Sequence, residues 1–440
     1  MQSIIFRARP YLLLTFTFFS LVGYTQESPA FQSLKKYYHS LPTNVMDTNW
    51  LMTPIDTGGM NYLLPLRQGL QREKNRAIID TAAYYDLLSD ALCRLTDYAT
   101  TQWYEKKLIG LPSREEQTIL RQQAQSFISA TGTDATAFIL RQTISGRIAL
   151  FNASYLKPYT YVWIGTMLDS LRKQGYRHLA LELLSPTKEP IQEISLSNGL
   201  FITEPVVGEF IRFAIAAGFS VISCQPDYSI PNLHERKKEQ AMRLGKYFQQ
   251  MPSGEKLLVV TQPEVLSGSD GKQLPPFSLY LSSWMGESCL SIDQCTLSSG
   301  SINDAGAFLY ELMSYQKPVN RPTVPLQNGQ PLLWNNPYYS ALVWHPTPSY
   351  NNQRPVWMGF YGKKKTIALP AAHPKSWLAQ AFYWEEVQKR RPGNCIPADQ
   401  TYQLAADGNY YLFLQPGKYR IIYRDKDNAL LTFRDIEVNR

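Results

Sequence analysis

Histidine and cysteine are scarce in this chain of 440 residues, which has 5 of each. No CxxC pair occurs, and no group of cysteines and histidines has the spacing of a zinc site, which argues against a structural zinc or iron–sulfur centre. Uninterrupted apolar runs are also short. None reaches the roughly 18 residues of a membrane-spanning helix, so a polytopic membrane protein is excluded.

The common catalytic motifs are absent as well. The sequence has no GxSxG nucleophile elbow and no glycine-rich phosphate loop. The string that begins at His234 and Glu235 has Lys238 where a zinc protease has its second histidine. We therefore expect no metal and no cofactor.

What the chain contains instead is a large apolar and aromatic fraction. Hydrophobic residues make up 44% and charged residues 18%, with 28 Tyr, 19 Phe and 9 Trp, which excludes a wholly disordered protein. The length predicts about two or three domains. The formal net charge is +8, a small excess for this length, and it gives no argument for a nucleic-acid partner.

Residues 1–26 are typical of a secretory signal peptide. Arg7 and Arg9 precede an apolar run at 11–24, and polar sequence follows from Gln26. The run is too short to span a membrane, and no cysteine lies near the cleavage region of a lipoprotein signal. Removal of this segment takes away two arginines and no acidic residue, so the mature chain would have a formal net charge of +6. The predicted location is secreted or periplasmic, with no membrane span after signal removal.

Export would place the cysteines in an oxidising compartment. Their number is odd, so at least one cannot pair within the chain. Cys289 and Cys295 are close enough in sequence to suggest a small disulfide loop.

The chain then divides by pattern. Residues 27–145 are predicted to be mostly helical, with one helix over 78–103 and another over 112–128 that Ser113 could cap. Residues 146–390 are predicted to form an α/β core, with 264–300 irregular and 318–355 an extended surface segment. Residues 395–440 contain about four alternating segments separated by turns and are predicted to form a small antiparallel β module.

In the core, buried strands alternate with amphipathic helices. The strands are predicted at 178–184, 219–224 and 256–261, and the helices at 161–174, 204–217 and 233–250. This order predicts an α/β fold with a mainly parallel sheet covered by helices on both faces. Active sites of such sheets form at the carboxyl ends of the strands. The segments that should meet at this edge are 152–158, 182–185, 225–228 and 262–264.

The order of these segments resembles a known family. The runs FNASYLKPYTY, LRKQGYRHLALELL, GLFITEPVVGEFIRFAIAAGF, ERKKEQAMRLGKYFQQMPSGEKLLVV and LSIDQC are similar, in order, to the erythromycin-esterase-like and ChaN-like (haem-uptake, Tiki-like) superfamily, and to its exported bacterial branch. The resemblance covers roughly residues 145–440. It implies a hydrolase or a haem-binding or metal-binding protein with histidines and glutamates at the strand ends.

This chain departs from the family at those histidines. Asn152 and Pro158 match the first family motif, N-E-x-H-H-x-P-x-H-R, but Ala153 replaces its glutamate, and Tyr155 and Leu156 replace its two histidines. Thr160 and Tyr161 replace the later His-Arg. Thr261-Gln262-Pro263-Glu264 replaces the G-x-x-H at the end of the last core strand.

Four family positions are retained, at Glu182, Glu204, Arg212 and Arg236. Proton abstraction from water needs a base such as histidine or glutamate, and neither alanine nor leucine can supply it. The four retained residues could also form ion pairs that hold helices in place, which needs no catalysis.

Two functions follow from this pattern. The preferred one is a catalytically degenerate binding protein whose pocket takes a small molecule or peptide. Its predicted ligand-binding residues are Asn152, Tyr155, Tyr159, Gln225, Asp227 and Gln262. The alternative is a hydrolase with a rearranged site, in which Glu182 or Glu204 is the general base and Arg212 or Arg236 holds an anionic intermediate. It would fail if both carboxylates were buried and paired bidentately with the arginines.

Overall fold

The computed structural model describes residues 27–41, 55–56, 59–74, 80–187, 189–263, 275–299, 304–334 and 338–439. The predicted signal peptide, residues 1–26, and the segment that contains Glu264 lie outside the described residues.

A six-stranded parallel sheet forms the centre of the molecule, in the order β11-β8-β4-β7-β5-β6. The strands are β4 (Ile148–Asn152), β5 (Tyr176–Leu181), β6 (Ser220–Ser223), β7 (Lys256–Thr261), β8 (Cys289–Asp293) and β11 (Ala341–Leu342). The predicted α/β fold with a mainly parallel sheet is therefore confirmed.

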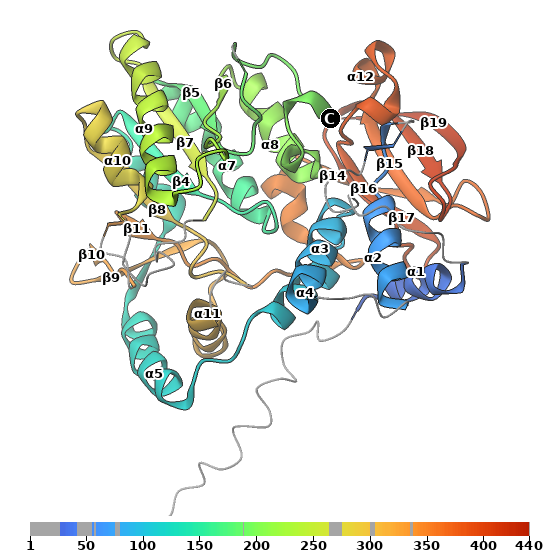
Figure 1. Cartoon of the computed structure of the whole chain (residues 1–440), viewed down its shortest axis with the longest axis horizontal. Coiled ribbons are helices and arrows are strands. Elements are labelled where there is room, and N and C mark those ends of the chain that lie inside the picture. The colour runs from blue at the N-terminus through green and yellow to red at the C-terminus, as the bar shows by residue number, and fades with distance from the viewer. Residues whose placement is uncertain are drawn as a thin grey trace, which may run out of the picture.

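Helices cover both faces of this sheet (Figure 1), and the alternation of side chains along each strand supplies both cores. They are α7 (Tyr159–Lys173), α8 (Pro205–Ala216), α9 (Leu233–Gln250) and α10 (Phe277–Met285). Phe151 and Leu179 belong to the core under α7 and α8, whereas Leu150 and Ala180 pack with α9 and α10. Gly175 and Gly218 follow α7 and α8 with φ of 98° and 85°, which glycine adopts without strain.

The N-terminal region is helical, as the sequence predicts. Its helices are α1 (Pro29–Ser40), α2 (Leu64–Lys74), α3 (Thr81–Arg94), α4 (Tyr98–Leu108), α5 (Arg114–Ser129) and α6 (Ala135–Gln142). The prediction of one helix over 78–103 was wrong. Thr96 has a φ of 59°, which interrupts the helix, and Asp97 then caps α4 by accepting the N–H of Thr100.

Two segments that were predicted to be irregular or to lie extended on the surface contain helices or strands and buried side chains. Within 264–300, α10 and β8 form, and β8 pairs with β4 in the middle of the sheet. Within 318–355, β11 extends the sheet and Trp344 is buried. The serine- and glycine-rich composition of 264–300 and the proline-rich composition of 318–355 are typical of loops and hid these elements.

The other short strands near the start of the chain and in this region are β1 (Ile55–Asp56), β2 (Gly59–Met60), β3 (Thr131–Asp134), β9 (Thr323–Gln327), β10 (Gln330–Pro331), β12 (Tyr350–Asn351) and β13 (Arg354–Pro355).

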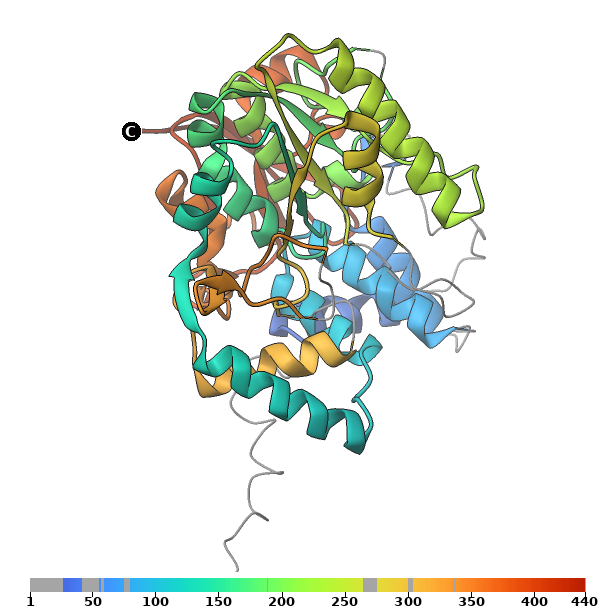
Figure 2. The same cartoon turned by 90° about the vertical axis from the view of Figure 1, so that its left-hand side faces the viewer.

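Helix α11 (Asp304–Gln316) packs beside α5 at the end of the molecule away from α9, as Figure 2 shows. Leu120 and Phe127 of α5 meet Leu309 and Met313 of α11 in a core of their own.

A small antiparallel module closes the chain. After Cys395 it contains four strands, and two earlier strands and a short helix join them. They are β14 (Lys365–Pro370), β15 (Leu378–Tyr383), α12 (Trp384–Lys389), β16 (Asp399–Thr401), β17 (Asn409–Leu414), β18 (Gly417–Arg424) and β19 (Leu430–Val438). Helices α1 to α4 pack against this module, where Leu378 and Tyr402 join the core that they form.

The five cysteines are all unpaired. The suggested bridge between Cys289 and Cys295 was wrong because Cys289 begins strand β8 and Cys295 lies beyond its end. An extended chain advances about 3.3 Å per residue, so the two residues are held much farther apart than a disulfide allows.

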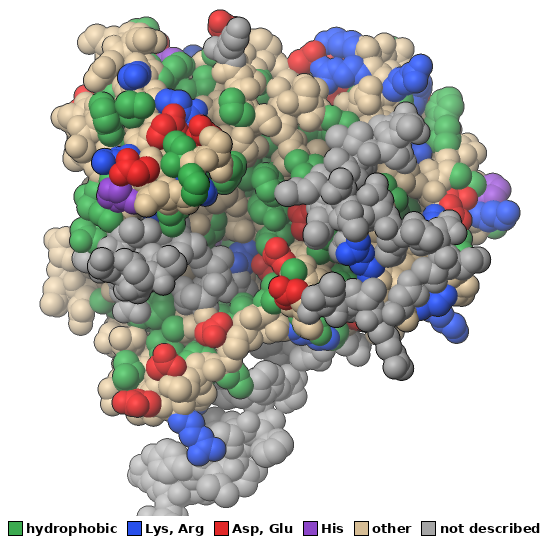
Figure 3. All heavy atoms as spheres, in the orientation of Figure 1, with side chains coloured by type: hydrophobic (Ala, Val, Ile, Leu, Met, Phe, Trp, Pro, Cys, Tyr) green, Lys and Arg blue, Asp and Glu red, His purple; other side chains and the backbone are tan. Residues whose placement is uncertain are grey.

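No helix within the described ranges combines the length and the apolar character needed to cross a membrane. On the face shown in Figure 3, acidic and basic side chains are interspersed and do not form one broad patch of a single sign.

Candidate functional site

The carboxyl edge of the parallel sheet brings together residues that are far apart in the sequence. Asn152 ends β4, Glu182 follows β5, Gln262 follows β7 and Asp293 ends β8. Because all four strands are parallel, their carboxyl ends lie at one edge. This is the edge at which the sequence predicts a site.

A cavity of about 290 Å³ opens at this edge, between the ends of β5 and β7 and the first turns of α9. Three of the predicted site residues line it, Glu182, Arg236 and Gln262. Tyr228, from the segment 225–228 that was predicted to reach this edge, also lines the cavity, whereas Lys237, Gln240 and Phe277 were not predicted.

Hydrogen bonds fix the position of Gln262 in the cavity. Its backbone N–H donates to Oε2 of Glu182 at 2.9 Å. Its side-chain amide donates to the carbonyl oxygen of Ala153 and to the hydroxyl of Tyr161, each at 2.9 Å. The carboxylate and the amide therefore form a rigid polar floor that connects β4, β5 and β7.

Helix α9 supplies the cationic side of the cavity. Asn232 caps the helix by accepting the N–H of Glu235 at 3.1 Å, and this places Arg236 in the first turn. Nε of Arg236 donates to the carbonyl oxygen of Ile230 at 2.9 Å, and its guanidinium lies 5.4 Å from the centre of the Tyr228 ring. The cavity thus carries a carboxylate on its floor and a guanidinium held by a backbone carbonyl on its wall.

The predicted ligand residue Asn152 lies at the same edge but outside the cavity lining. Its Nδ2 donates to Oδ1 of Asp293 at 2.9 Å, and its Oδ1 accepts the N–H of Gln294 at 2.8 Å. These two hydrogen bonds connect the ends of β4 and β8. The side chain of Asn152 is only 5% exposed, so little of it is available to a ligand.

Tyr155 and Tyr159 pack into the protein and do not line the cavity. The Tyr155 ring lies 4.8 Å from that of Phe201, and burial raises the pKa of its hydroxyl well above the usual value. Tyr159 is buried and its ring lies 5.1 Å from that of His345. Leu156 packs against a separate apolar cluster, so Tyr155 and Leu156 act as packing residues.

Gln225 and Asp227 follow strand β6 and also lie outside the cavity lining. The carbonyl oxygen of Gln225 accepts a hydrogen bond from Arg243 at 2.6 Å. Asp227 is exposed and accepts the N–H and hydroxyl of Ser229, and these hydrogen bonds lower its pKa. Asp227 therefore stabilises a turn.

Glu204 is fully buried at the start of α8, away from the cavity. Its Oε1 accepts the hydroxyl of Tyr98 at 2.6 Å and its Oε2 accepts the N–H of Val207 at 2.7 Å. Burial is the largest influence on this carboxyl and raises its pKa to about 7.

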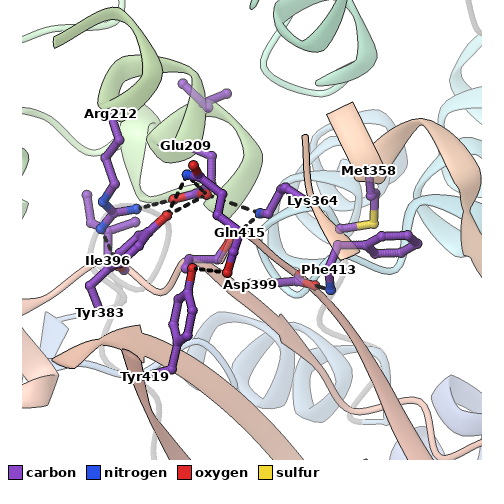
Figure 4. Close-up of polar contacts among 12 residues, drawn as sticks. Glu209, Arg212, Met358, Lys364, Tyr383, Ile396, Asp399, Phe413, Gln415 and Tyr419 are labelled. Atoms are coloured by element: carbon purple, nitrogen blue, oxygen red, sulfur yellow. Dashed lines mark hydrogen bonds and ion pairs between the residues drawn. The ribbon is translucent and has the colours of Figure 1, made fainter. Parts of the chain in front are cut away.

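Arg212 binds the antiparallel module to the core (Figure 4). Nε and Nη2 pair with the two carboxylate oxygens of Glu386 at 2.8 and 2.9 Å, Nη1 donates to Glu209 at 3.0 Å, and Nη2 also donates to the carbonyl oxygen of Ile396 at 2.7 Å. The guanidinium is thus engaged on all three nitrogens by protein groups, and Glu182 and Glu204 are not among its partners.

Sequence reasoning missed the rest of this buried cluster. Glu209 is inaccessible to solvent, lies 3.2 Å from Nζ of Lys364 and accepts the hydroxyl of Tyr383 at 3.0 Å. The sequence did contain one signal for this cluster, because Glu209 and Arg212 are three residues apart in a predicted helix and can therefore form an ion pair. Their partners come from a different layer of the fold, which no local pattern reveals.

Within the described residues, no group of three His, Cys, Asp or Glu side chains is arranged to hold a metal ion. No protein-family model, no curated protein and no solved structure matches the chain.

Proposed function

We propose that this chain is an exported, catalytically degenerate protein of the erythromycin-esterase-like and ChaN-like kind that binds a small polar ligand in the cavity at the carboxyl edge of its sheet. The observation that carries the proposal is the composition of that cavity. A carboxylate and a guanidinium, from Glu182 and Arg236, line it together with the rigid amide of Gln262 and the ring of Tyr228.

The residues that replace the family's first motif support a binding role. Ala153, Tyr155 and Leu156 belong to buried or partly buried apolar clusters and contribute no base to the cavity. A cavity of about 290 Å³ lies at the small end of the range for ligand sites, so the ligand is a small molecule. Its charges should complement the acidic floor and the basic wall.

The hydrolase alternative now depends on Glu182 and Arg236 alone. Glu204 has no solvent exposure, and Arg212 is occupied by Glu209 and Glu386. Among the described residues that line the cavity, Glu182 is the candidate base, and Arg236 is the candidate for holding an anionic intermediate.

Binding and turnover measurements distinguish the two functions. The full chain without its signal peptide is screened by thermal shift against free amino acids, dipeptides and small dicarboxylates, and hits are measured by calorimetry. We expect Arg236→Met to weaken binding of a hit at least tenfold, which is about 1.4 kcal/mol. Lys238→Met, an exposed change in the same helix turn, is the matched control and should leave binding unchanged.

The same protein is incubated with p-nitrophenyl acetate, a lactone and p-nitrophenyl phosphate. No turnover is expected. Turnover that Glu182→Ala abolishes would establish the hydrolase instead, and the absence of any ligand whose binding depends on Arg236 would refute the binding function.

Export is proposed from the pattern at residues 1–26. Expression of the full chain in a bacterial host, followed by fractionation and N-terminal sequencing, tests it. The expected product is outside the cytoplasm and begins near Glu27, whereas a cytoplasmic product of full length would refute export.

A further inference from the structure

A second and larger cavity lies between α1 and the loops at one end of the antiparallel module. It has a volume of about 760 Å³, within the range of small-molecule sites. Tyr37 of α1 forms one wall, and Trp377, Tyr402 and Tyr410 form much of the other. None of its lining residues belongs to the cavity at the strand ends.

A lysine lies between the aromatic walls of this groove. Nζ of Lys426 is 4.2 Å from the centre of the Trp377 ring and 5.0 Å from that of Tyr37. Burial lowers the pKa of Lys426. Within the described residues, the ammonium group thus has aromatic neighbours and no carboxylate partner.

The acidic residues beside Lys426 are occupied elsewhere. Oδ1 of Asp425 accepts the N–H groups of Asp427 and Ala429 at 3.0 and 2.8 Å. Asp427 accepts the hydroxyl of Tyr37 at 2.6 Å and lies 3.3 Å from the guanidinium of Arg67. The carboxylates of the groove are therefore engaged by other groups of the protein, while the ammonium of Lys426 is not.

Two further features favour a ligand that brings an acceptor and an apolar body. Lys375, which is exposed and lines the groove, adds a second positive charge at the rim. Leu404 is 44% exposed on the same surface, where it offers apolar contact.

We propose that this groove binds a small amphiphilic anion, whose carboxylate or phosphate group pairs with Lys426 and whose apolar body lies against Leu404 and the aromatic wall. An ion pair formed next to aromatic rings is less screened by water than one on an open surface. The rim lysine, Lys375, adds to the attraction and makes binding weaker as salt increases.

Four probes that each contain eight carbon atoms in a straight chain test this proposal by calorimetry on the full chain without its signal peptide. Octanoate and octyl phosphate carry the two candidate anions, and octanamide and octanol are neutral. Binding of either anion at least tenfold tighter than both neutral probes is expected, and the tighter anion identifies the head group. Equal binding of neutral and anionic probes, or no binding of any, would overturn the proposal.

Variants locate the site. Lys426→Met keeps the apolar stem and should weaken binding of the anion at least tenfold. Lys418→Met, an exposed change on strand β18 away from the groove, should not. If Lys426→Met lowers the melting temperature markedly, Leu404→Glu replaces it, because an exposed position tolerates the change and the new charge should repel the anion. Unchanged binding in both groove variants would also overturn the proposal.

Discussion

At the scale of single residues, burial changes the chemistry of several charged groups. Glu204 and Glu105 both have their pKa raised to about 7, and burial is the largest cause in each. His345 is buried and its pKa is lowered to about 3, so it is neutral at physiological pH. These groups lie inside the protein, so a change in their protonation changes the stability of the folded chain.

Glu204 makes a specific prediction about pH. A carboxyl whose pKa is higher in the folded chain binds its proton more tightly there, so its contribution is present below about pH 4.5 and is lost as the pH rises through about 7. The variant Glu204→Gln is neutral at every pH and should not show this loss. The difference in unfolding free energy, variant minus unmodified chain, should therefore increase by about 1–3 kcal/mol when the pH is raised from 4.5 to 8.

Urea denaturation at a series of pH values measures this difference. Thr118→Ala, an exposed change on α5 that removes no ionisable group, serves as the control and should give a difference that does not vary with pH. A constant difference for Glu204→Gln would show that burial does not raise this pKa in solution.

At the scale of elements, local sequence signals decided where most helices and strands lie. The helices predicted at 161–174 and 233–250 correspond to α7 and α9, and the strand predicted at 256–261 corresponds to β7. These elements were predictable because each has its own period of apolar residues and its own stop signal. The elements that were missed, α10, β8 and β11, lie in segments whose serine, glycine and proline content is typical of loops.

Helix α5 illustrates a local signal whose contribution can be measured. Ser113 accepts the N–H of Glu116 at 3.2 Å, and Glu116 accepts the N–H of Ser113 at 2.8 Å, which completes a capping box. We expect Ser113→Ala to reduce the unfolding free energy by about 1 kcal/mol. Amide hydrogen exchange along α5 should increase in parallel.

Thr118→Ala is the matched control for this change because Thr118 is exposed in the interior of the same helix. Alanine favours a helix, so this variant should be no less stable than the original chain. If the two variants behave alike, the capping box does not stabilise α5.

At the scale of the whole molecule, buried ion pairs connect parts of the chain that are distant in sequence. Arg354 of β13 pairs with both carboxylate oxygens of Asp399 in β16, at 2.9 and 2.7 Å. It also donates to Thr96, in the turn between α3 and α4. This one side chain therefore joins the N-terminal helices to the antiparallel module.

Removing this arginine should be strongly destabilising. In Arg354→Met the carboxylate of Asp399 stays buried without its partner, which costs about 3–5 kcal/mol. The double variant Arg354→Met/Asp399→Leu should recover part of this loss. Chemical denaturation measures both.

Arg420→Met is the control, because Arg420 and Asp435 form a similar pair 2.8 Å apart at the surface. Its effect should stay below about 1 kcal/mol. A loss of that size for Arg354→Met as well would mean that the buried pair does not hold the module to the helices.

The candidate site shows how far strand-end reasoning can go. Gln262 was predictable because it directly follows the strand predicted at 256–261, and Glu182 because it lies near the end of the strand predicted at 178–184, which in the structure ends at Leu181. Asn152, Tyr155 and Tyr159 were predicted in the same way, yet they pack into the edge of the sheet and do not line the cavity. The direction of a side chain after a strand depends on the neighbours that it meets, and these are fixed only in the folded chain.

The sequence by itself determined the class of fold, because the period of apolar residues and the order of strands and helices are local properties that a parallel sheet requires. Only the tertiary structure decided which charged residues act as partners of the fold and which face a cavity. Arg212 and Arg236 are alike as sequence signals, but one is enclosed by carboxylates from two layers and the other lines a cavity. Burial and pairing are long-range consequences of packing, and no window of sequence contains them.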